Sequence, residues 1–193
     1  EELKKQIAER PGQARIHSFL GMLYRTLGKS DKALAEFRLV QALSPNKPAT
    51  LFDIGMTQID RKEYALAEET FKEAFELAPE YDDARAYYIV GAIYAGDDAL
   101  VATLSAPPHD VLYRENDTIL QTYYALKKYD AALAILDARI KQTPTDVQLR
   151  ISYAAVQREM GDTTGAIGTL RAAANNFPDF RLQAEQFIKE MQK

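Results

Sequence analysis

The sequence contains no cysteine, which excludes disulfide bonds, thiolate metal sites and a cysteine nucleophile. Its two histidines, His17 and His109, lie too far apart to share one helix face, and neither has a second ligand at metal spacing. The pattern brings no Ser, His and acid combination together either. We therefore expect no cofactor, no metal site and no enzymatic activity.

Long apolar runs are also missing. No stretch of about 18 to 20 uninterrupted apolar residues occurs, so we expect no membrane insertion of this segment. The net charge of -4 argues against a general electrostatic grip on nucleic acid, which we do not expect as a partner. With 47% hydrophobic and 27% charged residues, the chain has the composition of a folded domain. Its compartment stays open between the cytoplasm and the bacterial periplasm.

Prolines recur along the chain at a nearly constant spacing. Five of the 8 prolines are separated by 34, 34, 65 and 34 residues, and 65 is close to two periods. These five are Pro11, Pro45, Pro79, Pro144 and Pro178. Alanines recur in the same phase, at Ala33, Ala67, Ala99, Ala132 and Ala166. A bulky apolar residue follows four positions later at Phe37, Phe71, Leu136 and Leu170, and this pattern indicates a repeated pair of helices.

Apolar residues followed by glycine stand upstream of these alanines, at Leu20-Gly21, Ile54-Gly55 and Val90-Gly91. The pattern resembles the tetratricopeptide repeat family, whose 34-residue signature combines an apolar-Gly pair, an Ala-x-x-x-Phe group and a closing proline. The resemblance implies an all-α fold, a right-handed α-α superhelical solenoid of about five helix hairpins with a C-terminal capping helix. Glycine is unfavourable inside a helix, so its recurrence there indicates that two helices approach closely.

The expected boundaries follow from this phase. We expect one solenoid over residues 1–193, and its repeats are 14–47, 48–81, a degenerate 84–111, 113–146 and 147–180. Residues 1–11 match only the end of a preceding repeat, so we expect the parent protein to continue upstream. The resulting N-terminal face is a candidate for weak self-association. Residues 180–193 carry apolar side chains at helical spacing, at Phe180, Ala184, Phe187, Ile188 and Met191, which predicts the capping helix.

The third unit departs from the pattern. When Val90-Gly91 is taken as its anchor, two residues are inserted after Pro79, while the stretch from Tyr94 to Ala99 is about one helical turn shorter than in the neighbouring units. We expect a stunted hairpin whose second helix lies near Asp98 to Ala106. That helix is expected to stop at Pro107-Pro108, because two rigid residues forbid its continuation. We therefore predict a hinge at Pro107 to Asp110, between residues 14–106 and 110–193.

In the family that the sequence resembles, five positions of each first helix face a concave surface that receives peptides or partner helices. The corresponding candidate residues are Arg15, Met22, Arg25, Phe52, Met56, Ile59, Arg85, Tyr88, Arg114, Tyr124, Ile151 and Arg158. Arginines bind carboxylates, and aromatic or Met side chains supply adaptable apolar contacts, so the groove favours an acidic and apolar segment. The alternative is a solvated groove whose arginines pair with neighbouring acids.

Two functions remain open. The first is a non-catalytic protein-protein interaction scaffold that binds a peptide or partner helix in its concave groove. The second is a soluble domain appended to a larger bacterial membrane protein. The stretch from Phe177-Pro178 to Lys189 resembles the end of the repeat regions of O-antigen polymerase or ligase-type polysaccharide proteins.

Overall fold

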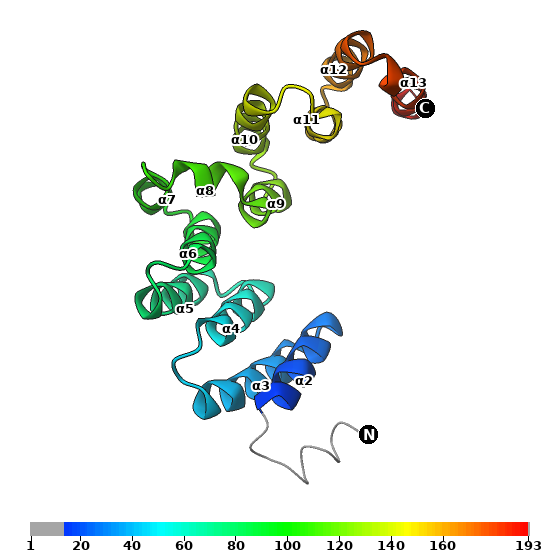
Figure 1. Ribbon diagram of the computed structural model, residues 1–193. Helices are drawn as coiled ribbons and strands as arrows, with labels where there is room; N and C mark the ends of the chain where they lie inside the picture. Colours follow the sequence, from blue (N-terminus) through cyan, green and yellow to red (C-terminus); the bar gives the residue numbers. More distant parts are fainter. Residues whose placement is uncertain (1–13, 193) are drawn as a thin grey trace. The chain divides into compact units, whose positions relative to one another are not determined.

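The computed structural model describes residues 14–192, and all regular structure in this range is helical (Figure 1). The first six helices are α2 (Ala14–Thr26), α3 (Ser30–Leu43), α4 (Pro48–Asp60), α5 (Tyr64–Leu77), α6 (Asp82–Ala95) and α7 (Asp98–Leu104). They are followed by α8 (Asp110–Glu115), α9 (Asp117–Ala125), α10 (Tyr129–Gln142), α11 (Val147–Glu159), α12 (Thr163–Asn176), the 3-10 turn η1 (Pro178–Phe180) and α13 (Arg181–Met191). The predicted all-α fold of helical hairpins is confirmed. The expected repeat remnant in residues 1–11 lies outside the described residues.

The chain divides into two compact units between His109 and Asp110. We call the part that ends at His109 the first unit, which contains α2 to α7, and the remainder the second unit, which contains α8 to α13. The division falls within the segment from Pro107 to Asp110, for which the sequence predicts a hinge. The hinge itself stays a prediction. None of the helices within residues 14–192 is both long enough and apolar enough to cross a membrane.

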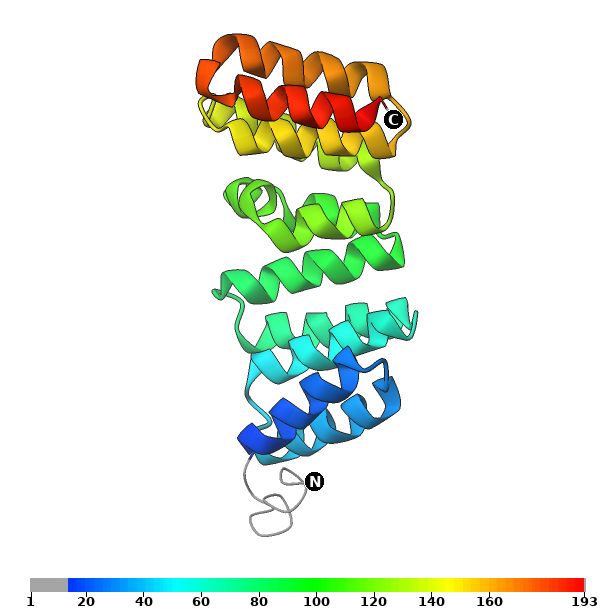
Figure 2. The same cartoon turned by 90° about the vertical axis from the view of Figure 1, so that its right-hand side faces the viewer.

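The first unit consists of three hairpins, α2/α3, α4/α5 and α6/α7, which stack in chain order (Figure 2). Their first helices begin 34 residues apart, at Ala14, Pro48 and Asp82. A residue with positive φ recurs between the helices of each hairpin with the same period, at Gly28, Lys62 and Gly96. The two-residue shift that the sequence suggested after Pro79 is therefore wrong, because α6 keeps the register of α2 and α4.

Two glycines explain how the first two hairpins close. A Cβ added to Gly21 would overlap the Phe37 ring, and one added to Gly55 would overlap the Phe71 ring. Both rings are fully buried, so each fills the space that its glycine leaves open. Gly91 does not share this role, because its added Cβ would lie 2.8 Å from Phe71 of the preceding hairpin.

The third hairpin reverses the order of large and small residues. In the 34-residue register, Ile89 takes the place of Gly21 and Gly55, and it is fully buried. Ser105 takes the place of the two phenylalanines, and it lies just beyond the end of α7. Helix α7 is 7 residues long, whereas α3 and α5 each have 14. The predicted shortened second helix is confirmed, and it ends at Leu104, ahead of the two prolines.

The second unit begins with a broken helix. The sequence predicted one first helix through Arg114 and Tyr124, but α8 ends at Glu115 and α9 begins at Asp117. Asn116 causes the break, since its side-chain Oδ1 accepts hydrogen bonds from the backbone N–H groups of Thr118 at 2.9 Å and Ile119 at 3.2 Å. Asparagine is among the best residues for this N-terminal capping position.

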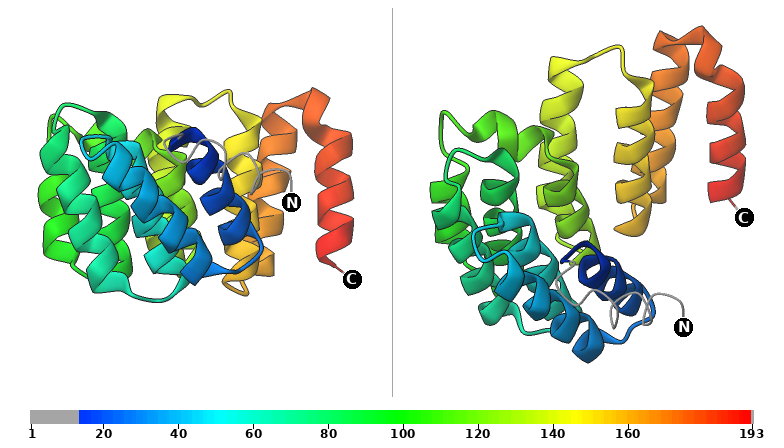
Figure 3. Two further views of the ribbon diagram at one scale, coloured as in Figure 1. Left: turned by 90° about the horizontal axis from the view of Figure 1, so that it is seen from below. Right: turned by 60° about the horizontal axis from the view of Figure 1, so that its bottom comes forward.

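The capping helix α13 closes the array at the C-terminus, where α11, α12 and α13 lie side by side (Figure 3). Phe180 and Ala184 belong to one buried cluster with residues of α11 and α12 such as Ala154 and Leu170. Phe187, Ile188 and Met191 pack against this cluster and are partly buried. The predicted apolar face of residues 180–193 is thus confirmed up to Met191. Its first residue, Phe180, belongs to the turn η1, and the others belong to α13.

Candidate functional site

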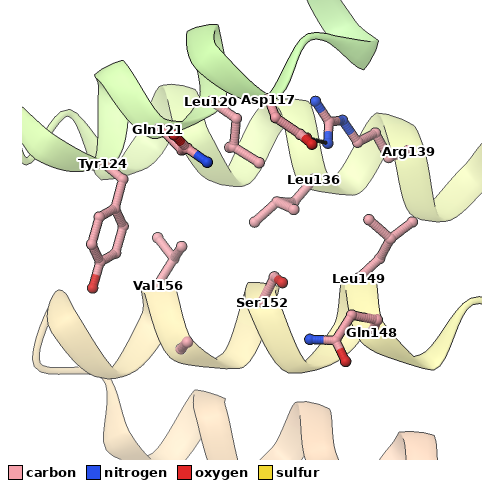
Figure 4. Close-up of a pocket in the computed structure, with 11 residues that line it drawn as sticks. Asp117, Leu120, Gln121, Tyr124, Leu136, Arg139, Gln148, Leu149, Ser152 and Val156 are labelled. Carbon is pink, nitrogen blue, oxygen red and sulfur yellow. Dashed lines mark hydrogen bonds and ion pairs between the residues drawn. The ribbon is translucent and has the colours of Figure 1, made fainter. Parts of the chain in front are cut away.

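A cavity of about 470 Å³ lies in the second unit between the first helices of its two hairpins (Figure 4). We call it the α9–α11 cavity. Its lining residues come from α9, α10 and α11, and they are Asp117, Leu120, Gln121, Tyr124, Leu136, Arg139, Gln148, Leu149, Ser152, Ala155 and Val156. This volume falls within the range of clefts that hold ligands.

The interior of the α9–α11 cavity is apolar. Leu120, Leu136 and Val156 point toward one another across the space between α9 and α11 (Figure 4). Leu136 and Val156 are buried, whereas Leu120 is only half-buried. Leu120 and Leu136 stand where the first two hairpins place glycine and phenylalanine, so two large side chains share the position in this hairpin. The surface that they leave uncovered becomes the floor of the cavity.

Uncharged polar groups surround this floor. Gln121 and Tyr124 come from α9, and Gln148 and Ser152 come from α11. Tyr124 is 42% exposed at the edge of the cavity. Burial, assisted by the Glu159 carboxylate, raises the pKa of Tyr124, so its hydroxyl stays protonated at neutral pH and can donate a hydrogen bond. Amide and hydroxyl groups of this kind can both donate to and accept from a peptide backbone.

The charges that line the cavity are paired with each other. The Arg139 Nη1 atom donates to the Asp117 carboxylate at 2.7 Å, and its Nε atom donates to the backbone oxygen of Arg114 at 2.6 Å. Arg139 is 8% exposed, whereas the Asp117 side chain is 76% exposed. Through these bonds Arg139 fastens the end of α8 and the start of α9 to α10. The same residue therefore holds one wall of the cavity in place.

Three of the four residues named above for the groove of the second unit lie outside this cavity. Ile151 and Arg158 line a separate cavity of about 220 Å³, together with Phe187 and Met191 of α13. Arg114 lies in α8, and its guanidinium pairs with Asp110 and Glu115 at 3.4 Å each. Of the four expected residues Arg114, Tyr124, Ile151 and Arg158, only Tyr124 lines the α9–α11 cavity.

The first unit has a cavity of about 380 Å³ with a charged lining, formed by Met22, Arg25, Thr26, Asp53 and Asp60. The sequence predicted Met22 and Arg25 at this surface. The Arg25 Nε atom lies 2.6 Å from the Asp60 carboxylate, so this cation is already paired. Burial raises the pKa of Asp53, although the positive charges of Arg25 and Lys47 partly oppose that shift.

The remaining expected residues of the first two hairpins are placed differently from one another. Arg15 is exposed, Met56 is half-buried, and Phe52 and Ile59 are buried. The Phe52 ring stacks on Tyr87 at a centroid distance of 4.4 Å, which covers much of the ring that was expected to face a partner.

The expected placement of Arg85 and Tyr88 is wrong. Arg85 lies over the ring of Phe75 at 4.9 Å, and the Tyr88 and Phe75 centroids are 5.7 Å apart. Both residues thus pack on the preceding helix α5, and Tyr88 is only 8% exposed. A shift of two residues turns a side chain by about 200° around a helix, which is why the register error moved them to the wrong face.

Leu136 and Arg139 were not predicted, because all the residues expected in the groove belong to first helices, whereas these two come from α10. A signal was present for one of them. Leu120 and Leu136 hold the positions of a glycine-phenylalanine pair in the first two hairpins, and two leucines there indicate a surface that is not fully covered. Among residues 14–192, no group of three or more His, Asp or Glu side chains could hold a metal ion.

Models of the tetratricopeptide repeat match residues 14–47, 48–81 and 147–179, which together make up more than half of the chain. The chain belongs to the tetratricopeptide repeat family. Residues 82–146, which lie between the matched segments, contain the short helix α7 and the break at Asn116.

Solved structures of tetratricopeptide repeat proteins share the fold. YrrB, described as having an unusual peptide-binding site, is 17% identical, with 98% of each chain covered and a TM-score of 0.54. A protein from Parabacteroides merdae is 16% identical over 99% of this chain and 75% of its own, with a TM-score of 0.63. TTC0263 from Thermus thermophilus is 20% identical over 90% and 97%, with a TM-score of 0.52. A search of the curated proteins found no match.

Proposed function

We propose that the chain is a non-catalytic scaffold for protein-protein interaction and that its second unit binds a peptide segment in the α9–α11 cavity. Tetratricopeptide repeats generally mediate interactions between proteins. The observation that carries the proposal is the cavity itself, in which an apolar floor is surrounded by amide and hydroxyl groups. The floor can take one side chain of a peptide, while the surrounding groups bind its backbone.

The residues present favour binding over chemistry. The one hydroxyl on the α11 wall, Ser152, has no histidine among the residues that line the cavity with it. Activation of a serine nucleophile requires an adjacent base. The hypothesis of a domain appended to a larger membrane protein is compatible with this role and stays a prediction.

The proposal can be tested with a substitution that fills the cavity. Ser152 is half-buried on α11, and its side chain points into the cavity, so Ser152→Phe places a ring over the apolar floor (Figure 4). Ala134→Phe is the matched control, because Ala134 is exposed on α10 and lines none of the cavities described above. Peptides selected from a random displayed library against the intact chain serve as probes.

We expect Ser152→Phe to weaken the selected peptides at least tenfold, as measured by fluorescence anisotropy, because it occupies the space of the anchoring side chain. Ala134→Phe should leave the affinity unchanged. Circular dichroism establishes that both variants are folded. Selected peptides that bind Ser152→Phe as tightly as the original chain would show that the cavity is not the binding site.

A further inference from the structure

We infer that the α9–α11 cavity selects an uncharged apolar side chain as its anchor and rejects an acidic one. This inference rests on the proposed function and specifies the chemistry of its partner. It differs from the sequence expectation of an acidic and apolar segment, which counted arginines without knowing how they are paired. The structure supplies those pairings.

The guanidinium on the wall of the α9–α11 cavity is that of Arg139. Arg139 is neutralised by Asp117 and also binds the Arg114 backbone oxygen, so two of its three nitrogens are occupied. The third, Nη2, has no hydrogen-bond partner among the described residues, but it is buried, so a carboxylate that enters the cavity does not reach it. A peptide carboxylate entering the cavity would have to compete with Asp117, which already accepts from Nη1 at 2.7 Å.

The apolar floor of the cavity disfavours a charged anchor through desolvation. An acidic anchor would lose water against Leu120, Leu136 and Val156, none of which can hydrogen-bond to it through its side chain. To gain a charge partner it would also have to displace Asp117 from Arg139. An aliphatic or Met side chain suffers neither penalty and buries its own apolar surface instead.

The other arginines on which the expectation of an acidic partner rested lie outside this cavity. Arg25 pairs with Asp60, and Arg114 pairs with Asp110 and Glu115. Arg85 lies over the ring of Phe75. These three cations have partners within the chain, so they offer a peptide little free charge. The exposed Arg15 and Arg158 do not line the α9–α11 cavity.

The test removes the negative charge from the ion pair of Asp117 and Arg139. Asp117→Asn keeps the size of the side chain but removes the charge that neutralises Arg139, so the cavity wall becomes positive. Asp130→Asn is the matched control, because Asp130 is exposed near the start of α10 and lines none of the cavities described above. A peptide whose binding is abolished by Ser152→Phe is synthesised with Leu, Met, Glu or Lys at its anchor position, which an alanine scan identifies.

The original chain should bind the Leu and Met peptides at least tenfold more tightly than the Glu peptide. In Asp117→Asn the ratio of the Glu-peptide Kd to the Leu-peptide Kd should fall at least threefold, because the Glu peptide binds more tightly. Asp130→Asn should leave this ratio unchanged. Circular dichroism melting excludes misfolding as the cause. If the Glu peptide binds the original chain as tightly as the Leu peptide, this inference is overturned but the proposed function is not. If no selected peptide depends on the cavity, the proposed function fails with it.

Discussion

The first and second units solve the same packing problem with different pairs of residues. In α4/α5 a glycine, Gly55, makes room for the fully buried ring of Phe71. In α11/α12 the corresponding pair is Ala154 and Leu170, and both are fully buried. In α9/α10 the pair is Leu120 and Leu136, and Leu120 remains half-buried beside a cavity. Hairpins of one fold thus differ in how much apolar surface they leave for a partner.

The cavities of the two units differ in charge as well. The cavity of the first unit contains the ion pair of Arg25 and Asp60 and the partly desolvated Asp53. The cavity of the second unit has an aliphatic floor, and its single ion pair lies at one end, between Asp117 and Arg139. The comparison shows that a family-wide groove position does not fix the chemistry of the groove, because neighbouring side chains decide which charges are free.

The largest expected effect comes from removing the close approach in the first unit. Gly55→Ala should lower the free energy of unfolding by about 2 kcal/mol, because the new methyl group overlaps the rigid Phe71 ring. The cost should be visible in urea denaturation. Adding Phe71→Leu recreates the alanine-leucine pair of α11/α12, so the double variant should lose less stability than the two single changes predict by addition.

Gly168→Ala is the matched control for this experiment. Gly168 lies inside α12, and an added Cβ there meets no atom within 4 Å. It should gain about 0.5–1 kcal/mol from helix propensity alone. If Gly55→Ala also stabilised the protein, close packing against Phe71 would not be the reason for the glycine.

A somewhat smaller effect is expected at Arg139. The residues that line the cavity of the first unit include no arginine from the second helix of a hairpin. Arg139→Met keeps the length of the side chain but removes its bonds to the Arg114 backbone oxygen and Asp117. We expect the free energy of unfolding to fall by about 1.5 kcal/mol, at the lower end of the range for hydrogen bonds that involve a charged group. Hydrogen exchange should accelerate mainly in α8 and α9. Arg171→Met, at an exposed position of α12, should change stability by less than about 0.5 kcal/mol.

The smallest expected effect should be equal in the two units. Lys62 has φ 63 and Lys127 has φ 57, in the left-handed region where the other hairpins place glycine. Replacing either lysine by glycine should raise the free energy of unfolding by about 0.5–1 kcal/mol, because glycine adopts this backbone without strain. Thermal melting measures the gain. Lys72→Gly, inside α5, should instead cost about 1 kcal/mol, and a gain there would refute the backbone explanation.

The parts of the fold that could be predicted are those that depend on residues close in sequence. The prolines and alanines recur with one period because each hairpin uses the same turn and the same close contact, so they located most helices. The apolar face of α13 was equally readable from helical spacing. The register of the third hairpin could not be predicted in this way. Gly91 follows an apolar residue as Gly55 does, but it contacts Phe71 of the preceding hairpin rather than a residue of its own hairpin.

The candidate site was only partly predictable, for a related reason. Tyr124 was found because it occupies a groove position of a first helix. Arg139 was missed, since its role depends on Arg114 and Asp117, which lie 25 and 22 residues away in sequence. The break between α8 and α9 was also missed, although Asn116 is a capping residue by type.

The sequence by itself determined the family, the 34-residue period, the all-α class and the presence of a capping helix. These properties follow from turns, helix propensity and the spacing of apolar residues, which act over a few neighbouring positions. The tertiary structure alone decided which arginines are free, which aromatic residues are covered and where a cavity opens. Those outcomes depend on pairings between helices, where the size and charge of one side chain set what its neighbour can do.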